Sequence, residues 1–152
     1  NMSIVKSVVK SNDLRKSLFT KRVVSILNNT LKNKRITFLG VTFKPNTDDM
    51  REAASIPMIN YLNKKNCKIT YYDPSGEKNE FKNMKNVKYT DTASKACQKA
   101  DLIILHTEWN DFKLLNFKKL VRKNNFKVFD MRNLYSPSKM KKMNIKYFGV
   151  GR

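Results

Sequence analysis

The 152-residue sequence has few of the residues that build metal sites and nucleotide-binding loops: two cysteines, one histidine and four glycines. Cys67 and Cys97 lie far apart and outside any C-x-x-C pair. A structural zinc site needs about four soft ligands at suitable spacing. We therefore expect no metal site, and we interpret both cysteines as reduced thiols of the core.

Long apolar runs are missing as well. No stretch approaches the roughly 20 apolar residues of a membrane-spanning helix. Residues 1–6 lack the apolar core of a signal peptide. The sequence thus predicts a soluble, cytoplasmic protein without a membrane partner. Its 40% of hydrophobic residues suffice for the core of one α/β domain.

Negative charge is scarce, because 12 acidic residues face 32 basic ones and the formal net charge is +20. Such a charge attracts polyanions, so a basic nucleic-acid-binding module is one candidate function. A dedicated nucleic-acid surface usually gathers its cations on one face or in one tail, whereas the lysines here occur in every segment. We interpret most of this charge as solvated surface and predict no specific nucleic-acid partner.

Two patterns of apolar residues divide the chain. Residues 4–32 show helical spacing, and they form an arm (residues 1–33) whose apolar stripe has no partner within the arm. From residue 34 on, short apolar runs alternate with helical stretches, which predicts an α/β fold with a doubly wound, mostly parallel Rossmann-like sheet. We predict strands at residues 35–40, 67–72, 87–89, 102–105, 127–130 and 145–148, and helices at residues 53–65, 92–99, 117–123 and from Ser136 onward.

A ligand of such a sheet binds at the carboxyl ends of the strands, where the order 3-2-1-4-5-6 reverses. The loops facing that crevice are residues 41–51, 106–110 and 131–135. Lys44 offers a point charge and Arg132 a planar guanidinium for phosphate. Alternatively, Lys44 is one more surface lysine and Arg132 pairs with Asp130 or Asp73.

Helix capping adds to this expectation. Thr47 and Asp48 are typical of a helix N-cap, and the helix that they predict carries Arg51 in its first turn. Its positive end would face the crevice.

The same region lacks the usual dinucleotide fingerprint. The loop after the first strand has one glycine, Gly40, where G-x-G-x-x-G is required. Asp73, at the end of the second strand, lies much farther from Gly40 than the spacing of about 20 residues expected of a ribose-binding acid. We therefore exclude NAD bound to this domain in the ordinary way. We interpret His106, Trp109 and Phe112 as structural residues.

Residues 40–52, GVTFKPNTDDMRE, resemble the G-x-x-F-K-P-x-T-D-D-x-R-E signature of the UDP-glucose/GDP-mannose dehydrogenase family, and its UDP-glucose branch most closely. Four further blocks follow in the family's order, and the resemblance covers residues 34–152. The blocks are YDP at residues 72–74, TEW at 107–109, DMRNLY at 130–135 and YFGVGR at 147–152.

The resemblance implies an enzyme of three parts that oxidises UDP-glucose to UDP-glucuronate with NAD. An amino-terminal domain binds NAD, a middle domain carries the nucleophilic cysteine and builds a homodimer, and the last domain binds UDP. The arm resembles the end of the middle domain. Neither Cys67 nor Cys97 matches the nucleophile, so we expect no catalytic residue in this chain and no oxidation by the chain alone.

Carried over by position, Phe43, Lys44 and Arg132 resemble the family's substrate-binding residues, and Arg51 resembles an arginine that reaches NAD on the other domain. Three alternatives stay open besides the nucleic-acid module. The substrate could be UDP-N-acetylmannosamine or GDP-mannose, or the chain could be a degenerate structural fragment.

Overall fold

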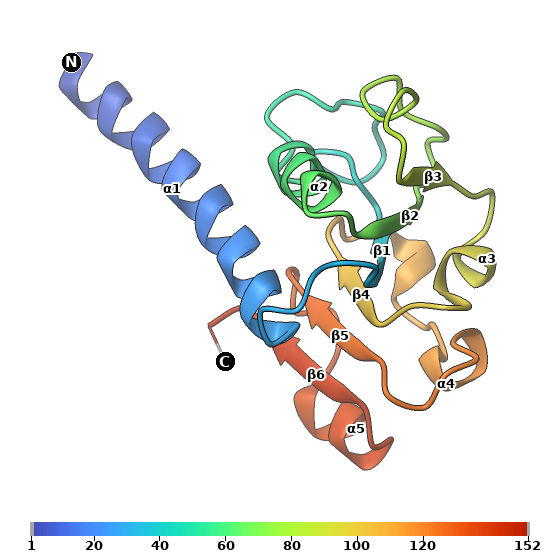
Figure 1. The fold of residues 1–152 in the computed structure, drawn as a ribbon. Coiled ribbons are helices and arrows are strands. Elements are labelled where there is room, and N and C mark those ends of the chain that lie inside the picture. Colours follow the sequence, from blue (N-terminus) through green and yellow to red (C-terminus); the bar gives the residue numbers. More distant parts are fainter. Residues whose placement is uncertain (1, 152) are drawn as a thin grey trace.

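Six short parallel strands form one sheet in the computed structural model, which describes residues 2–151 (Figure 1). Their spatial order is β3-β2-β1-β4-β5-β6, so the chain reverses direction across the sheet between β1 and β4. The predicted fold class and strand order are confirmed, and each predicted strand end lies within one residue of the observed one. The strands are β1 Arg35–Leu39, β2 Lys68–Tyr72, β3 Val87–Tyr89, β4 Leu102–Leu105, β5 Lys127–Asp130 and β6 Lys146–Gly149.

Helices cover both faces of the sheet because alternate strand residues point to opposite sides. On one face, α1 (Met2–Ile26) and α2 (Ser55–Lys64) pack against Ile36 and Phe38 of β1. On the other, α3 (Ala93–Cys97), α4 (Phe117–Leu120) and α5 (Pro137–Lys142) pack against Leu39, Ile103 and Val128. Both cysteines are free and buried in these two cores, and burial raises the pKa of both thiols.

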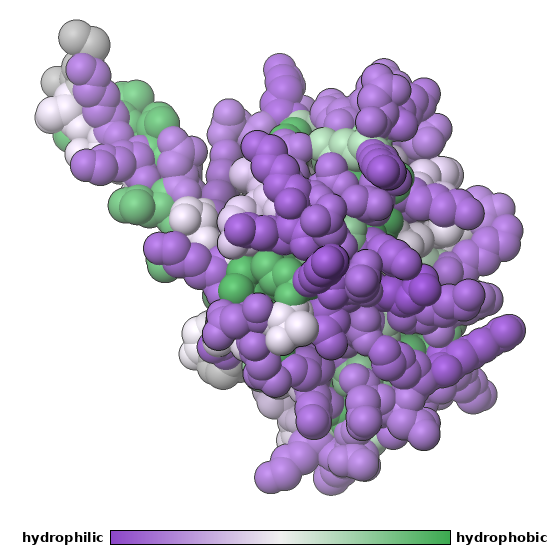
Figure 2. All heavy atoms as spheres, in the orientation of Figure 1, coloured by the Kyte–Doolittle hydropathy of each residue, from purple (hydrophilic) through white to green (hydrophobic). Residues whose placement is uncertain are grey.

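The long helix α1 ends at Ile26, short of the predicted residue 32. Asn28 and Asn29 adopt φ angles of 54° and 58°, a left-handed conformation that stops a helix. Val23 and Ile26 are buried, while the amino-terminal part of α1 projects from the sheet domain (Figures 1 and 2). The exposed apolar residues there are Ile4, Val5, Val8, Val9, Leu14 and Leu18. Among residues 2–151, no helix has the length and apolar content of a membrane span.

Asparagine takes the place of glycine at most of the tight turns. A side chain with a Cβ atom rarely adopts positive φ, but the short polar asparagine tolerates it better than most. A sequence with four glycines can therefore still make sharp turns. The asparagines with positive φ are Asn28, Asn29, Asn33, Asn46, Asn66, Asn133 and Asn144.

The shorter helices end earlier than predicted, and one short helix was not predicted. The helix expected at residues 117–123 ends at Leu120, because Val121 turns to an extended conformation and is buried in the core. The 3₁₀ helix η1 (Asn110–Phe112) buries Phe112. Trp109 and Phe112 are packing residues, as interpreted from the sequence.

Gly40 follows β1 at a position that requires glycine. Its φ is 74°, and a Cβ atom added there would lie 2.6 Å from the Cβ atom of Thr107. The absence of a side chain thus lets the loops after β1 and β4 approach each other.

Replacing Gly40 with alanine should destabilise the protein by about 3 kcal/mol, because the backbone strain of positive φ adds to the clash with Thr107. Gly76 is the matched control, with a φ of 94° and open space around it. Gly76→Ala should cost only about 1 kcal/mol, the strain alone. Urea denaturation of both variants measures the difference, and equal losses would contradict the close approach at Gly40.

Candidate nucleotide-binding site

One cleft of about 410 Å³ lies at the point where the strand order reverses. The loops after β1, β4 and β5 form one wall and α1 forms the other. Of the residues predicted for a ligand site, Phe43 and Arg132 line the cleft, whereas Lys44 and Arg51 do not. The lining residues are Asn12, Arg15, Lys16, Phe19, Phe43, Glu52, Ala54, His106, Met131 and Arg132.

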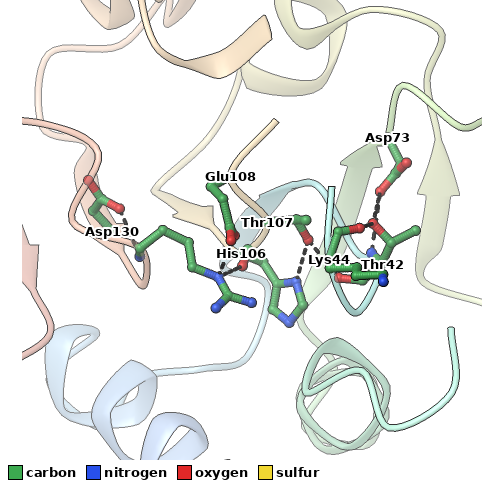
Figure 3. Close-up of polar contacts among 8 residues, drawn as sticks. Thr42, Lys44, Asp73, His106, Thr107, Glu108 and Asp130 are labelled. Atoms are coloured by element: carbon green, nitrogen blue, oxygen red, sulfur yellow. Dashed lines mark hydrogen bonds and ion pairs between the residues drawn. The ribbon is translucent and has the colours of Figure 1, made fainter. Parts of the chain in front are cut away.

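The buried carboxylate of Asp73 holds the loop that carries Phe43. Its Oδ2 atom accepts hydrogen bonds from the backbone amide of Val41 at 2.8 Å and from that of Thr42 at 3.3 Å. Figure 3 shows Asp73 beside Thr42. Its Oδ1 atom accepts from the backbone amide of Ser75 at 2.9 Å and from the Ser75 hydroxyl at 2.5 Å. Asp73 is fully buried, so these bonds replace the hydration of its charge.

A buried lysine, Lys78, is linked to Asp73 through the hydroxyl of Ser75. The ammonium of Lys78 donates to the Ser75 hydroxyl at 2.6 Å, and its backbone amide donates to the Tyr71 hydroxyl at 2.8 Å. Lys78 is only 4% exposed. Asp73 and Lys78 therefore place opposite charges on either side of Ser75, which reduces the cost of burying each of them.

Two hydroxyls join the same loop to its neighbours. Thr107 donates from Oγ1 to the Thr42 carbonyl at 2.8 Å, and Ser55 donates from Oγ to the Val41 carbonyl at 2.5 Å. The loop is thus attached to β2, β4 and α2 at once. Phe43 follows Thr42 in this loop, and half of its surface is exposed at the cleft.

The predicted helix starting at Thr47 is wrong. Residues 41–54 contain no helix, and the next one, α2, starts at Ser55. The Thr47 hydroxyl accepts the Asp49 amide only two residues on, and the Phe43 amide donates to the Asp49 carbonyl, so the loop folds back on itself. The helix end near the cleft belongs to α2, whose N-cap residue Ala54 is one of the lining residues.

Arg51 points into solvent instead of the cleft, and its side chain is 89% exposed. Its guanidinium binds the Asp49 carboxylate through two hydrogen bonds, of 2.9 and 3.0 Å. These side-chain bonds, followed by the Arg51 backbone amide, lower the pKa of Asp49 to about 2. Lys44 is also exposed, and it forms no salt bridge in the described part of the chain.

Arg132 reaches the cleft, and its guanidinium pairs with neither Asp130 nor Asp73, the two partners considered from the sequence. Its Nε atom donates to the His106 carbonyl at 2.8 Å and lies 2.9 Å from Oε2 of Glu108, an ion pair without hydrogen-bond alignment. Asp130 binds the backbone amide of Arg132, at 3.0 Å, and not its guanidinium, while Asp73 binds the amides of the loop after β1. The hydrogen bond and the ion pair of this guanidinium both involve Nε, so its two terminal nitrogens have no hydrogen-bond or ion-pair partner among residues 2–151.

The rest of the DMRNLY block shapes the loop. Asp130 accepts hydrogen bonds from the backbone amide of Tyr135 and the hydroxyl of Tyr147. Asn133, with a φ of 53°, donates to the Val150 carbonyl at 3.1 Å and accepts the Val150 amide at 3.0 Å. These bonds fix the turn from which Arg132 projects.

The helix α1 contributes four lining residues that sequence reasoning missed. Asn12, Arg15, Lys16 and Phe19 follow the i, i+3, i+4, i+7 spacing of a single helix face. Lys16 pairs with Glu52 across the cleft at 2.5 Å. The spacing alone could have revealed this polar face, but only the fold shows that it meets the ends of the strands.

His106 is buried at the end of β4 and lines the cleft. Its Nδ1 atom lies 2.9 Å from the Thr107 hydroxyl (Figure 3). Burial, and second the positive charge of Arg132, lower its pKa from 6.5 to about 3. The imidazole is therefore neutral at physiological pH.

Since His106 is the one histidine of the chain, its ring signal can be followed without assignment. In the folded protein we expect no titration from about pH 8 to about pH 5, whereas the urea-unfolded chain should titrate near 6.5. The unfolded ring takes up a proton that the folded ring refuses, so this group's contribution to stability is present above pH ~6.5 and lost as the pH falls toward ~3. A folded signal that titrates near its ordinary pKa would contradict the burial.

Asp73→Asn should destabilise the protein by about 2 kcal/mol, because hydrogen bonds to a buried charged group are lost or weakened. Hydrogen exchange at the amides of Val41 and Thr42 should accelerate. Asp91→Asn is the control, since Asp91 is exposed and pairs only with Lys95 on the surface. That control should cost less than about 0.5 kcal/mol, and equal effects of the two changes would contradict the role given to Asp73.

A model of the UDP binding domain of the UDP-glucose/GDP-mannose dehydrogenase family matches residues 37–137, which include the three loops of the cleft. The chain is 37% identical over 151 residues to UDP-glucose 6-dehydrogenase of Rickettsia prowazekii and 33% identical over 152 residues to that of Rhizobium meliloti. These alignments cover 97% and 98% of the chain but 35% and 34% of the relatives. The chain thus spans about a third of their length.

Two solved structures share the fold. A UDP-glucose dehydrogenase from Pyrobaculum islandicum superposes with a TM-score of 0.77 at 22% identity, covering 98% of this chain and 32% of that one. A GDP-mannose dehydrogenase from Pseudomonas aeruginosa superposes with a TM-score of 0.67 at 16% identity, covering 99% and 34%. With the family model matching all three loops at the carboxyl ends of β1, β4 and β5, the chain belongs to the UDP-glucose/GDP-mannose dehydrogenase family.

Proposed function

We propose that the domain of residues 34–152, together with the facing side of α1, binds the UDP part of a nucleotide sugar in the cleft between α1 and the carboxyl ends of β1, β4 and β5. One observation carries the proposal: an exposed aromatic ring, Phe43, and the free end of a guanidinium, Arg132, line the same cleft. An aromatic face can stack on a base, and a guanidinium can bind phosphate oxygens in pairs. The match to a UDP binding domain supports this pairing of roles.

Lys44 acts at the rim in this proposal. It follows Phe43, lies exposed and forms no salt bridge among residues 2–151, although its charge lowers the pKa of Asp49 slightly. A lysine side chain is long and flexible, so its ammonium can reach a phosphate from outside the cleft. The buried ties of the loop to Asp73 fix the backbone from which both side chains extend.

The domain does not fit NAD bound in the manner of a dinucleotide fold. The acid at the end of β2 that would bind a ribose, Asp73, is fully buried and holds backbone amides instead. We propose that NAD binds elsewhere in the complete enzyme, where it supplies the hydride acceptor. Arg51, exposed and outside the cleft, is the residue of this chain that would reach it.

The complete protein is proposed to be an NAD-dependent UDP-glucose 6-dehydrogenase that acts as a homodimer. The named relatives at 37% and 33% identity favour UDP-glucose over UDP-N-acetylmannosamine and GDP-mannose as substrate. Residues 1–33 would be the end of its middle domain. The apolar residues exposed on the amino-terminal part of α1 support this assignment, because such a surface is normally covered.

Calorimetric titration of the chain with UDP tests the proposal. We expect saturable binding at one site, tighter for UDP than for GDP or CDP. Arg132→Ala and Phe43→Ala should each weaken binding about tenfold, the loss expected for one charge-assisted contact or one stacked base. Lys141→Ala, an exposed lysine on α5, is the control and should leave binding unchanged.

The dependence on salt separates this site from a basic surface that attracts polyanions. Binding that falls steeply with salt, shows no base preference and responds equally to Lys141→Ala and Arg132→Ala would favour the nucleic-acid alternative. No saturable binding of UDP at all would refute the proposed function.

A further inference from the structure

His106 lines the cleft, and one of its ring atoms, Nε2, has no hydrogen-bond partner among residues 2–151. The residue is 2% exposed and belongs to the cleft lining. Its Nδ1 atom contacts the Thr107 hydroxyl, and within residues 2–151 no group is hydrogen-bonded to Nε2. Figure 3 shows the Nδ1 edge of the ring facing Thr107 and the opposite edge pointing away from it.

Thr107 determines which nitrogen carries the proton. Its hydroxyl has one hydrogen, which it donates to the Thr42 carbonyl at 2.8 Å. Toward His106, 2.9 Å away, the same oxygen can therefore only accept. The ring proton must then lie on Nδ1, and Nε2 carries a lone pair.

The lone pair excludes one class of ligand contact and favours another. Phosphate oxygens are acceptors, so they gain nothing from a second acceptor. Cations that suit phosphates are present in the same cleft on Arg15, Lys16 and Arg132, with the carboxylate of Glu52 paired to Lys16. An acceptor beside them requires an N–H or O–H group on the ligand. In a uridine nucleotide the candidates are the N3–H of uracil and the ribose hydroxyls.

We infer that Nε2 of His106 accepts a hydrogen bond from an N–H or O–H donor of the nucleoside, and so sets the position of the nucleoside relative to the phosphates. This inference rests on the proposed function. It extends that function to a residue that lies directly before the TEW block and belongs to none of the five sequence blocks. The contact is buried, so a nucleotide lacking the donor leaves Nε2 unsatisfied. His106 thus selects the ligand by its nucleoside instead of its charge.

Calorimetry with four ligands tests the inference: UDP, 2′-deoxy-UDP, 3′-deoxy-UDP and N3-methyl-UDP. The unmodified chain should bind one of the three analogues about fivefold more weakly than UDP, the loss of one neutral hydrogen bond. His106→Phe should bind UDP about fivefold more weakly and should no longer distinguish that analogue from UDP. His106→Gln retains an acceptor and should therefore bind UDP more tightly than His106→Phe does. This second variant keeps the test valid if phenylalanine disturbs the fold.

Each outcome decides a different point. If UDP binds and neither His106 variant changes the affinity or the discrimination, the inference is wrong while the proposed function stands. If UDP does not bind the unmodified chain, both are wrong. A ¹⁵N spectrum of the free protein adds an independent check, because a protonated Nε2 would overturn the inference without any ligand.

Discussion

The geometry of the cleft depends on one buried anion, Asp73. Its two oxygens accept amides from the loop after β1 and from the turn after β2, so a single carboxylate joins two strand ends. The buried ammonium of Lys78 lies beyond Ser75 and balances that charge inside the protein. The sequence places an acid at the end of the second strand, where dinucleotide folds use one for the ribose. In this chain the acid binds backbone amides instead and holds the loop that carries Phe43.

Charge in the cleft is only partly balanced by the protein. Glu52 pairs with Lys16 and Glu108 with Arg132, while Arg15 in the cleft forms no salt bridge among residues 2–151. A diphosphate would supply the missing negative charge. His106 is the exception in this basic surrounding, since it is held neutral and offers an acceptor. The cleft therefore combines cations for phosphates with one neutral group suited to a nucleoside.

Local sequence signals were sufficient for the sheet and insufficient for the loops. The buried run at residues 102–105 and the β-favouring runs around it predicted all six strands, because both faces of a parallel sheet need apolar residues. The Thr47 cap failed because Thr47 bonds to Asp49 in a tight turn, and Glu52 adopts a φ of 60° that no local rule predicts. The α1 wall and the Glu108 partner of Arg132 depend on contacts between distant segments, which periodicity cannot show.

The most direct test of this account is a map of amide shifts in ¹⁵N spectra of the chain as UDP is added. The account predicts that the shifts gather on the loops after β1, β4 and β5 and on the facing turns of α1, with Phe43, His106 and Arg132 among the affected residues. A second basic groove, at Lys68, Lys88 and Lys99 near α3, serves as the internal reference and should stay unaffected. Shifts that concentrate in that groove, with the cleft unchanged, would contradict the account.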